Sequence, residues 1–321
     1  MSNIDVFNGD ADGIVALLQL RWRYPQQSTL VTGVKRDIQL LQRVDVAAGD
    51  NVCVLDISAE RNGRDLKRIL EAGAHVFYVD HHRRGDIPLS PNLVTRIDPD
   101  PYQCTSTLVD QYLNGAYRSW AVAAAFGDNL TETAIKLARS LSLTTEQTNF
   151  LKELGILLNY NGYGREVNDL HYHPAELYKQ LQAYPDPFAL MLLKDSVFTN
   201  LQDAYQRDMA KAKNSPIVYQ SDNAVVILLA DAPWSRRVSG VYGNELANQN
   251  PERAHGVVTD NGDDTYTVSV RAPINRRSGA DEICSQFPNG GGRAAAAGIN
   301  QLPCDQLESF WQILSNYYQQ H

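Results

Sequence analysis

Carboxylate and imidazole side chains follow three of the strands that the sequence predicts. They lie in Asn8-Gly9-Asp10-Ala11-Asp12-Gly13 after residues 4–7, in Asp56 after residues 51–55, and in Asp80-His81-His82 after residues 75–79. Such ligands suit Mn²⁺, Fe²⁺, Zn²⁺ or Mg²⁺. Two such ions about 3.5–4 Å apart can polarise a phosphoryl group and generate a hydroxide between them. The residue types therefore indicate metal-assisted phosphate chemistry.

The N-terminal third of the chain has the alternation of strands and helices that could position these groups. The apolar runs 51–55 and 75–79 are typical of buried strands, and helices are expected over residues 13–23 and 61–72. This alternation predicts a parallel sheet covered by helices on both faces. Because the carboxyl ends of parallel strands share one edge, we expect the three segments to meet there.

Each of these residues also has an ordinary explanation when it is taken singly. An Asp after a strand commonly caps a helix or forms a turn, which would fit Asp10 and Asp12. His81 and His82 could be surface residues. The ordered combination of Asp-x-Asp-Gly, a strand ending in Asp, and a strand ending in Asp-His-His nevertheless favours a metal site.

The same segments carry a resemblance to a known family. Asp10-Ala11-Asp12-Gly13, Leu55-Asp56-Ile57-Ser58 and Asp80-His81-His82 resemble the first three motifs of DHH phosphoesterases, and Phe126-Gly127-Asp128-Asn129 lies where the fourth belongs. Near the C-terminus, the glycine-rich run from Asn289 to Gly298 resembles the signature of the DHHA1 domain, and Val268-Ser269-Val270-Arg271 resembles a strand of that domain. The resemblance covers nearly the whole chain, with the motifs in the family's order.

The resemblance implies a role for each matching residue. One metal ion would be held by Asp12, Asp56, His81 and Asp128, and a second by Asp10 and the bridging Asp56, with Mn²⁺ as the usual ion. His82 would lie beside the metal ligands or contact the phosphate, so Asp56 and His82 are the candidate catalytic residues. The substrate would be held by Arg271 and by a loop of Gly290, Gly291, Gly292 and Arg293, whose backbone N–H groups could surround a phosphate.

Two residues depart from the family pattern. Asn8 stands where the first motif normally begins with His, and we expect an amide oxygen to give a weaker or more Mg²⁺-tolerant second metal site. Arg293 stands where the DHHA1 signature usually has His. Its permanent charge would hold a phosphate more firmly, although a solvated loop residue is the alternative.

Two further residues are candidate phosphate contacts. Ser106 begins an expected helix after the third motif, where helix capping and phosphate binding explain it equally well. Arg165 lies in an aromatic and glycine-rich stretch with Tyr160 and Tyr163, which could stack on nucleobases or pack in the core.

The expected fold is α/β with two domains. Residues 1–195 would form the DHH metal-binding domain with a helical extension, residues 196–214 a connector helix, and residues 215–321 a smaller α/β DHHA1 domain that binds substrate across a cleft. Asn261-Gly262-Asp263-Asp264 predicts a hairpin turn between two strands of the second domain.

The bulk properties narrow the class of substrate. The 321 residues carry a formal net charge of −8, whereas proteins that bind long nucleic acid usually have a basic surface.

The four cysteines are scattered without a CxxC pair, so we expect no disulfide framework and no thiolate near the metal site. The chain has no apolar run of about 18 residues and no secretory signal, which predicts a cytoplasmic protein without a membrane partner. The sequence leaves a homodimer open.

These observations predict a metal-dependent phosphodiesterase that hydrolyses very short linear oligonucleotides to mononucleotides. The resemblance to stand-alone DHH/DHHA1 enzymes points to dinucleotides such as pGpG, an intermediate of cyclic di-GMP degradation. One alternative is a phosphatase of small compounds such as adenosine bisphosphate or pyrophosphate. Another is a non-catalytic nucleotide-binding protein in which Asn8 marks a decayed metal site, although the retained carboxylates argue against it.

Overall fold

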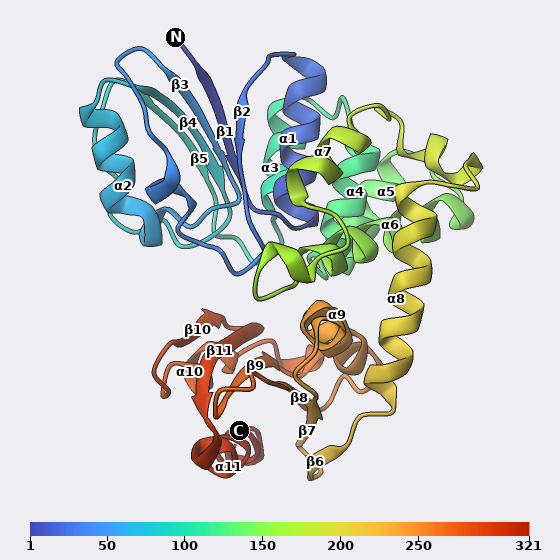
Figure 1. The fold of residues 1–321 in the computed structure, drawn as a ribbon. Coiled ribbons are helices and arrows are strands. Elements are labelled where there is room, and N and C mark those ends of the chain that lie inside the picture. The colour runs from blue at the N-terminus through green and yellow to red at the C-terminus, as the bar shows by residue number, and fades with distance from the viewer. Residues whose placement is uncertain (321) are drawn as a thin grey trace. The chain divides into compact units, whose positions relative to one another are not determined.

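The computed structural model describes residues 1–320, which form two compact units (Figure 1). Unit 1 covers Met1–Asp203, and unit 2 begins at Ala204. The division falls inside helix α8 (Val197–Lys213). Within the described residues, no helix is both long and apolar enough to cross a membrane.

Unit 1 is built on a five-stranded parallel sheet with the strand order β2-β1-β3-β4-β5. The strands are β1 (Asn3–Phe7), β2 (Thr29–Val31), β3 (Asn51–Leu55), β4 (His75–Asp80) and β5 (Leu93–Ile97). Side chains alternate between the two faces, as the pleat of a strand requires. Ile4 and Val6 of β1 face one core, whereas Asp5 and Phe7 face the opposite side, where they contact Arg21 and Tyr178.

Helices cover both faces of this sheet, as the sequence predicts (Figure 1). On one face, Leu66 and Ile69 of α2 pack into the core that contains Val52, Val54 and Tyr78. The other face carries α1 and the helical part of the unit. The helices of unit 1 before α8 are α1 (Ala11–Arg23), α2 (Ala59–Glu71), α3 (Thr105–Tyr112), α4 (Arg118–Gly127), α5 (Thr131–Ser140), α6 (Thr145–Gly162) and α7 (Pro174–Leu181).

Unit 2 is a smaller α/β unit with a six-stranded mixed sheet in the order β10-β11-β9-β8-β7-β6. Only β7 and β8 pair in parallel, and the other neighbours are antiparallel. Its elements are β6 (Ile217–Gln220), β7 (Ala224–Leu229), α9 (Pro233–Gln249), β8 (Ala254–Asp260), β9 (Thr265–Arg271), α10 (Ala280–Cys284), β10 (Gly290–Arg293), β11 (Ala296–Pro303) and α11 (Leu307–Gln320).

The strands of unit 2 pack helices on both faces. Val258 and Val268 contact the core formed with Phe310 and Leu314 of α11. The opposite face lies under α9, where Gly243 approaches Val257 and Arg271. The expected turn at Asn261–Asp264 does join β8 to β9, with Gly262 at a positive φ of 73°.

The buried His255 of β8 makes unit 2 sensitive to acid. Its ring is 1% exposed, and burial, with a further contribution from Arg253, lowers its pKa to about 4. The unfolded chain therefore takes up a proton below pH 6.5 that the folded state accepts only near pH 4, so stability falls as the pH falls through this window. We expect His255 to cost the wild type about 2 kcal/mol between pH 7 and pH 5.

Urea denaturation of the wild type and of His255→Leu at both pH values checks this expectation. The variant should lose less stability than the wild type on acidification. Equal losses in the two proteins would mean that His255 does not carry the acid sensitivity.

Candidate metal centre

The acidic segments meet at one edge of the unit 1 sheet. Phe7, Leu55 and Val79 are register partners on adjacent parallel strands. The residues that follow them, Asn8, Asp56 and Asp80, therefore lie at the same edge of the sheet. Asp56 has a left-handed backbone (φ 59°) and donates its N–H to the carbonyl of Val79 at 3.1 Å. A turn of this kind is tolerated best by Asp, Asn and Gly.

The N-terminus of α1 brings two more carboxylates to the same edge. Asp10 caps the helix, since its Oδ1 accepts from the N–H groups of Asp12 and Gly13 at 3.0 and 3.1 Å. Asp10 is thus a helix cap, as its position allowed, and it also lies in the site. Asp12 is 1% exposed, and its two oxygens accept the N–H groups of Thr105 and Ser106, each at 2.7 Å.

Ser106 supports Asp12 in the structure. Its hydroxyl donates to the Asp12 carbonyl at 2.8 Å, and the residue has no exposed surface. We therefore assign Ser106 to the positioning of Asp12 and do not carry forward its expected contact with substrate. Neighbouring Thr105, which the sequence did not single out, donates its hydroxyl to Asp56 Oδ1 at 3.1 Å.

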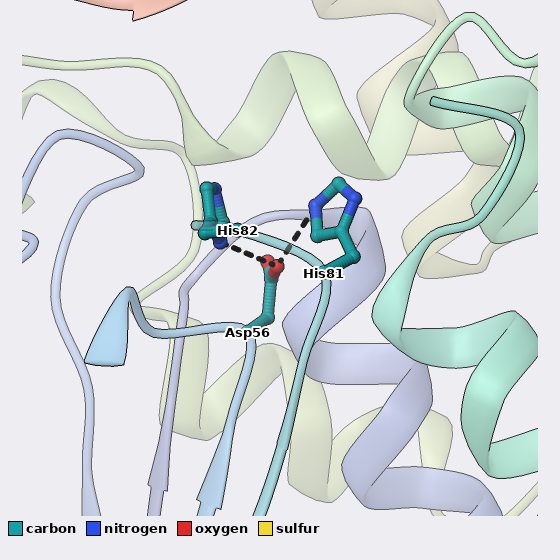
Figure 2. Close-up of side chains that lie close together, drawn as sticks. All are labelled: Asp56, His81 and His82. Carbon is teal, nitrogen blue, oxygen red and sulfur yellow. Dashed lines mark ion pairs between the residues drawn. The ribbon is translucent and has the colours of Figure 1, made fainter. Parts of the chain in front are cut away.

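His81 points one ring nitrogen at three carboxylates. Its Nε2 lies 3.4 Å from Asp56 Oδ1, 3.6 Å from Asp128 Oδ2 and 3.8 Å from Asp12 Oδ2. Its Nδ1 lies 3.0 Å from the carbonyl of Gln103, which can only accept, so Nδ1 carries a proton. In the neutral ring Nε2 then offers its lone pair to a metal ion. Figure 2 shows this ring beside Asp56. Asp12, His81 and Asp128 offer ligand atoms close enough together to hold one metal ion, and so do Asp56, His81 and His82.

His82 lies on the other side of Asp56 (Figure 2). Its Nδ1 is 2.6 Å from Asp80 Oδ1 and 3.9 Å from Asp56 Oδ1. Asp80 is fully buried, whereas the His82 side chain is 33% exposed. The buried Asp80 thus orients the ring of His82, and the exposed part of the ring can reach a bound molecule.

Burial and mutual repulsion raise the pKa values of the central carboxyl groups. The pKa of Asp12 rises to about 6, because the group is buried and lies near Asp128 and Asp10. The pKa of Asp56 rises well above its ordinary value for the same reasons, burial first and then neighbouring carboxylates. A cluster that holds protons so strongly in the absence of a cation is suited to bind one.

This repulsion makes metal affinity dependent on pH. A proton held by Asp12 below pH 6 competes with the ion, and above that pH the carboxylate is free. We expect the Kd for Mn²⁺ to be at least about tenfold higher at pH 5 than at pH 7, with protons released on binding. Calorimetric titration in two buffers of different ionisation enthalpy measures both quantities. An affinity independent of pH would contradict this description of the site.

Lys35 is a member of the site that sequence reasoning missed. Its Nζ forms an ion pair with Asp10 Oδ2, lies 3.3 Å from Asp128 Oδ1, and donates to Asn159 Oδ1 at 3.1 Å. Burial alone would lower the pKa of Lys35, but Asp10 and Asp128 raise it well above its ordinary value. A signal was present, because Lys35 follows β2 at the same sheet edge as the acidic segments.

Asn8 lies beside this lysine. It is 5% exposed, and its Nδ2 donates to the Lys35 carbonyl at 3.3 Å. Its amide oxygen is buried and has no hydrogen-bond partner in the structure. The oxygen is therefore able to accept a cation, although the sequence alone does not determine which one.

A cysteine that the sequence did not single out also lies in the site. The buried Cys104 hydrogen-bonds to Asp12. Burial, together with Asp12 and Asp128, raises the pKa of its thiol well above the ordinary value, so it remains protonated. Nothing in the sequence indicated this contact because Cys104 lies outside the four motifs, and its raised pKa leaves a thiol, not a thiolate, beside Asp12.

In unit 2, the glycine run is a strand and not the expected open loop. Gly290–Arg293 forms the edge strand β10, which pairs with β11 in antiparallel register. A Cβ on Gly290 would lie 1.9 Å from the Cys284 carbonyl oxygen, and Gly292 has a φ of 151°. Close packing and backbone conformation thus explain two of the glycines, whereas the space beside Gly291 is open.

The two arginines proposed to hold substrate differ in their surroundings. Arg271 ends β9, and its guanidinium donates to Asn244 Oδ1 at 2.5 Å and to the carbonyls of Gly240 and Val270 at 3.1 and 3.0 Å. α9 therefore fixes its position. Arg293 is exposed at the end of β10.

Several solved structures share this fold along the full chain. The pGpG-specific phosphodiesterase PggH from Vibrio cholerae aligns with a TM-score of 0.57 at 16% identity, covering 100% of this chain and 99% of that one. The exonuclease RecJ bound to manganese aligns with a TM-score of 0.58 at 15% identity, covering 99% and 90%. An exopolyphosphatase-related protein from Bacteroides fragilis aligns with a TM-score of 0.53 at 15% identity, covering 99% and 92%.

At these identities the likeness establishes the fold. No family model matches the sequence, and neither does any curated protein. The α/β architecture that the DHH/DHHA1 resemblance predicts, a parallel sheet followed by a smaller second unit, is confirmed.

Proposed function

We propose that the protein is a metal-dependent phosphodiesterase that hydrolyses very short linear oligonucleotides, such as pGpG, to mononucleotides. The observation that carries the proposal is the geometry around His81, whose Nε2 faces three buried carboxylates at 3.4–3.8 Å. The fold shared over the full chain with a protein described as a pGpG-specific phosphodiesterase supports the choice of substrate.

In this proposal a divalent ion, Mn²⁺ in the first instance, is held by Asp12, Asp56, His81 and Asp128. When bound, it would activate a water and neutralise charge on the phosphate. Thr105 and Ser106 hold Asp12 and Asp56 in place by the hydrogen bonds described above. Asp80 orients His82, whose exposed ring would contact the substrate phosphate.

The anionic substrate requires cationic groups besides the metal ligands. A cavity of about 400 Å³ in unit 1 is lined by Arg36, Arg43 and Arg165 together with Val34, Asp37, Glu166 and Val167. Arg43 pairs with Asp37, so Arg36 and Arg165 are the candidates in this cavity for contact with a phosphate. In unit 2, Arg271 and Arg293 are our candidates for holding the substrate phosphate.

Hydrolysis of a panel of substrates by the purified protein with Mn²⁺ tests the proposal. The panel contains pGpG, other dinucleotides, a five-nucleotide RNA, cyclic di-GMP, adenosine bisphosphate and pyrophosphate. Release of mononucleotides from dinucleotides supports it. Release of phosphate only from the bisphosphate or pyrophosphate would replace it with a small-molecule phosphatase, and binding without turnover would leave a nucleotide-binding protein.

A further inference from the structure

We propose that the ammonium group of Lys35 occupies the position expected for a second metal ion, so that the centre binds one divalent ion per chain. The inference rests on the proposed metal-dependent function and specifies its metal content. It departs from the two-ion arrangement that the sequence resemblance implies, and it comes from contacts within unit 1.

The first observation concerns Asp10, because both of its carboxylate oxygens already have partners. Its Oδ1 accepts the two N–H groups at the start of α1, and its Oδ2 pairs with Lys35 Nζ. The resemblance assigns Asp10 to the second ion only. Since the carboxylate is shared between a helix cap and a lysine, an additional divalent ion would have to displace the ammonium group.

The ammonium group also has the surroundings of a bound cation. Oxygens of Asp10, Asp128 and Asn159, which belong to three separate segments of the chain, lie around it. The ring centroid of Tyr163 is 5.5 Å from Nζ. Asp128 is shared, because its Oδ1 faces Lys35 at 3.3 Å and its Oδ2 faces His81 at 3.6 Å. The side chain is 23% exposed, so a substrate phosphate can approach it.

The backbone around Lys35 is built to bring this side chain to the site. A Cβ on Gly9 would lie 1.9 Å from the Gly33 carbonyl oxygen, so only glycine lets the segment after β2 pass this close to the first motif. The Lys35 N–H donates to the Gly162 carbonyl at 2.8 Å, and its carbonyl accepts from Asn8 at 3.3 Å. Lys35 is thus held from both sides.

The replacement of the family's histidine by Asn8 agrees with this arrangement. Loss of an imidazole weakens a transition-metal site, and a resident ammonium group removes the need for it. Unlike a divalent ion, an ammonium group cannot bind and deprotonate water. Lys35 would therefore supply a fixed positive charge toward the phosphate, and one ion would activate the water.

The experiment counts bound Mn²⁺ in metal-stripped protein after equilibrium dialysis and records its electron paramagnetic resonance spectrum. Wild type should bind one ion with the spectrum of an isolated Mn²⁺. Lys35→Met should bind two, with the spectrum of a coupled pair, because Asn8 Oδ1, Asp10 and Asp56 become available to a second ion. Lys136→Met, at an exposed position in α5, is the matched control and should bind one.

Any other result of this experiment would overturn the inference. Two coupled ions in the wild type, or a single ion in Lys35→Met at saturating Mn²⁺, would overturn the inference while leaving a metal-dependent hydrolase in place. No bound ion in the wild type would overturn the proposed function as well. If Lys35→Met does not fold without metal, it is refolded in Mn²⁺, and a Lys35→Gln variant provides a second neutral replacement for the same count.

Discussion

Replacing Asp56 with Asn should lower the turnover of the proposed substrates by at least about 10³-fold, or about 4 kcal/mol of transition-state stabilisation. Asp56 is 2% exposed and lies 3.4 Å from His81 Nε2, so the substitution removes a charged ligand at the centre of the site. Asn suits this position because it tolerates the φ of 59° that Ala would adopt only with strain. Steady-state kinetics with pGpG and Mn²⁺ measures the loss.

Measurements of stability distinguish a loss of activity in Asp56→Asn from a failure of the variant to fold. Because the pKa of Asp56 is raised by burial and by neighbouring carboxylates, a neutral amide should leave the metal-free protein at least as stable as the wild type. Thermal unfolding without metal should therefore show no decrease, whereas the stabilisation by Mn²⁺ should largely disappear. The exposed Asp45→Asn is the control. A variant that keeps most of its activity would remove Asp56 from the proposed mechanism.

Replacing Arg21 with Met should destabilise unit 1 by about 3–5 kcal/mol. Arg21 in α1 makes a two-pronged ion pair with Asp5 in β1, at 2.8 Å from Nε and 2.5 Å from the terminal nitrogen. The two side chains are 7% and 0% exposed, so the substitution leaves a buried carboxylate that keeps only its hydrogen bond from Ser28, at 2.6 Å. Urea denaturation followed by circular dichroism measures the loss.

Two further variants test the cause. Arg23→Met, at an exposed position on the same helix, should change stability by less than about 0.5 kcal/mol. The double variant Asp5→Asn with Arg21→Met should recover a large part of the loss, because no charge remains unpaired. A loss under about 1 kcal/mol in the single variant would contradict the expected cost of an unpaired buried charge at Asp5.

The arrangement of the carboxylates follows directly from the order of residues along the chain. Asp56 and Asp80 each come at the end of an apolar run, and parallel strands place such ends at one edge whatever the surrounding helices do. Asp10 and Asp12 follow the first strand in the same way. This is why the parallel sheet and the edge at which Asp12, Asp56 and His81 lie together could be predicted from the sequence.

What the sequence did not determine depends on contacts between residues distant along the chain. The position of Lys35 after β2 brings it to the edge but does not distinguish it from a solvated lysine. Its place in the site comes from Asp10, Asp128 and Asn159 on three other segments. The glycine run 290–293 has low strand propensity and becomes β10 only because β11 supplies its hydrogen bonds. The sequence thus determines which ligand types gather at the sheet edge. Only tertiary packing places the ammonium group of Lys35 among them.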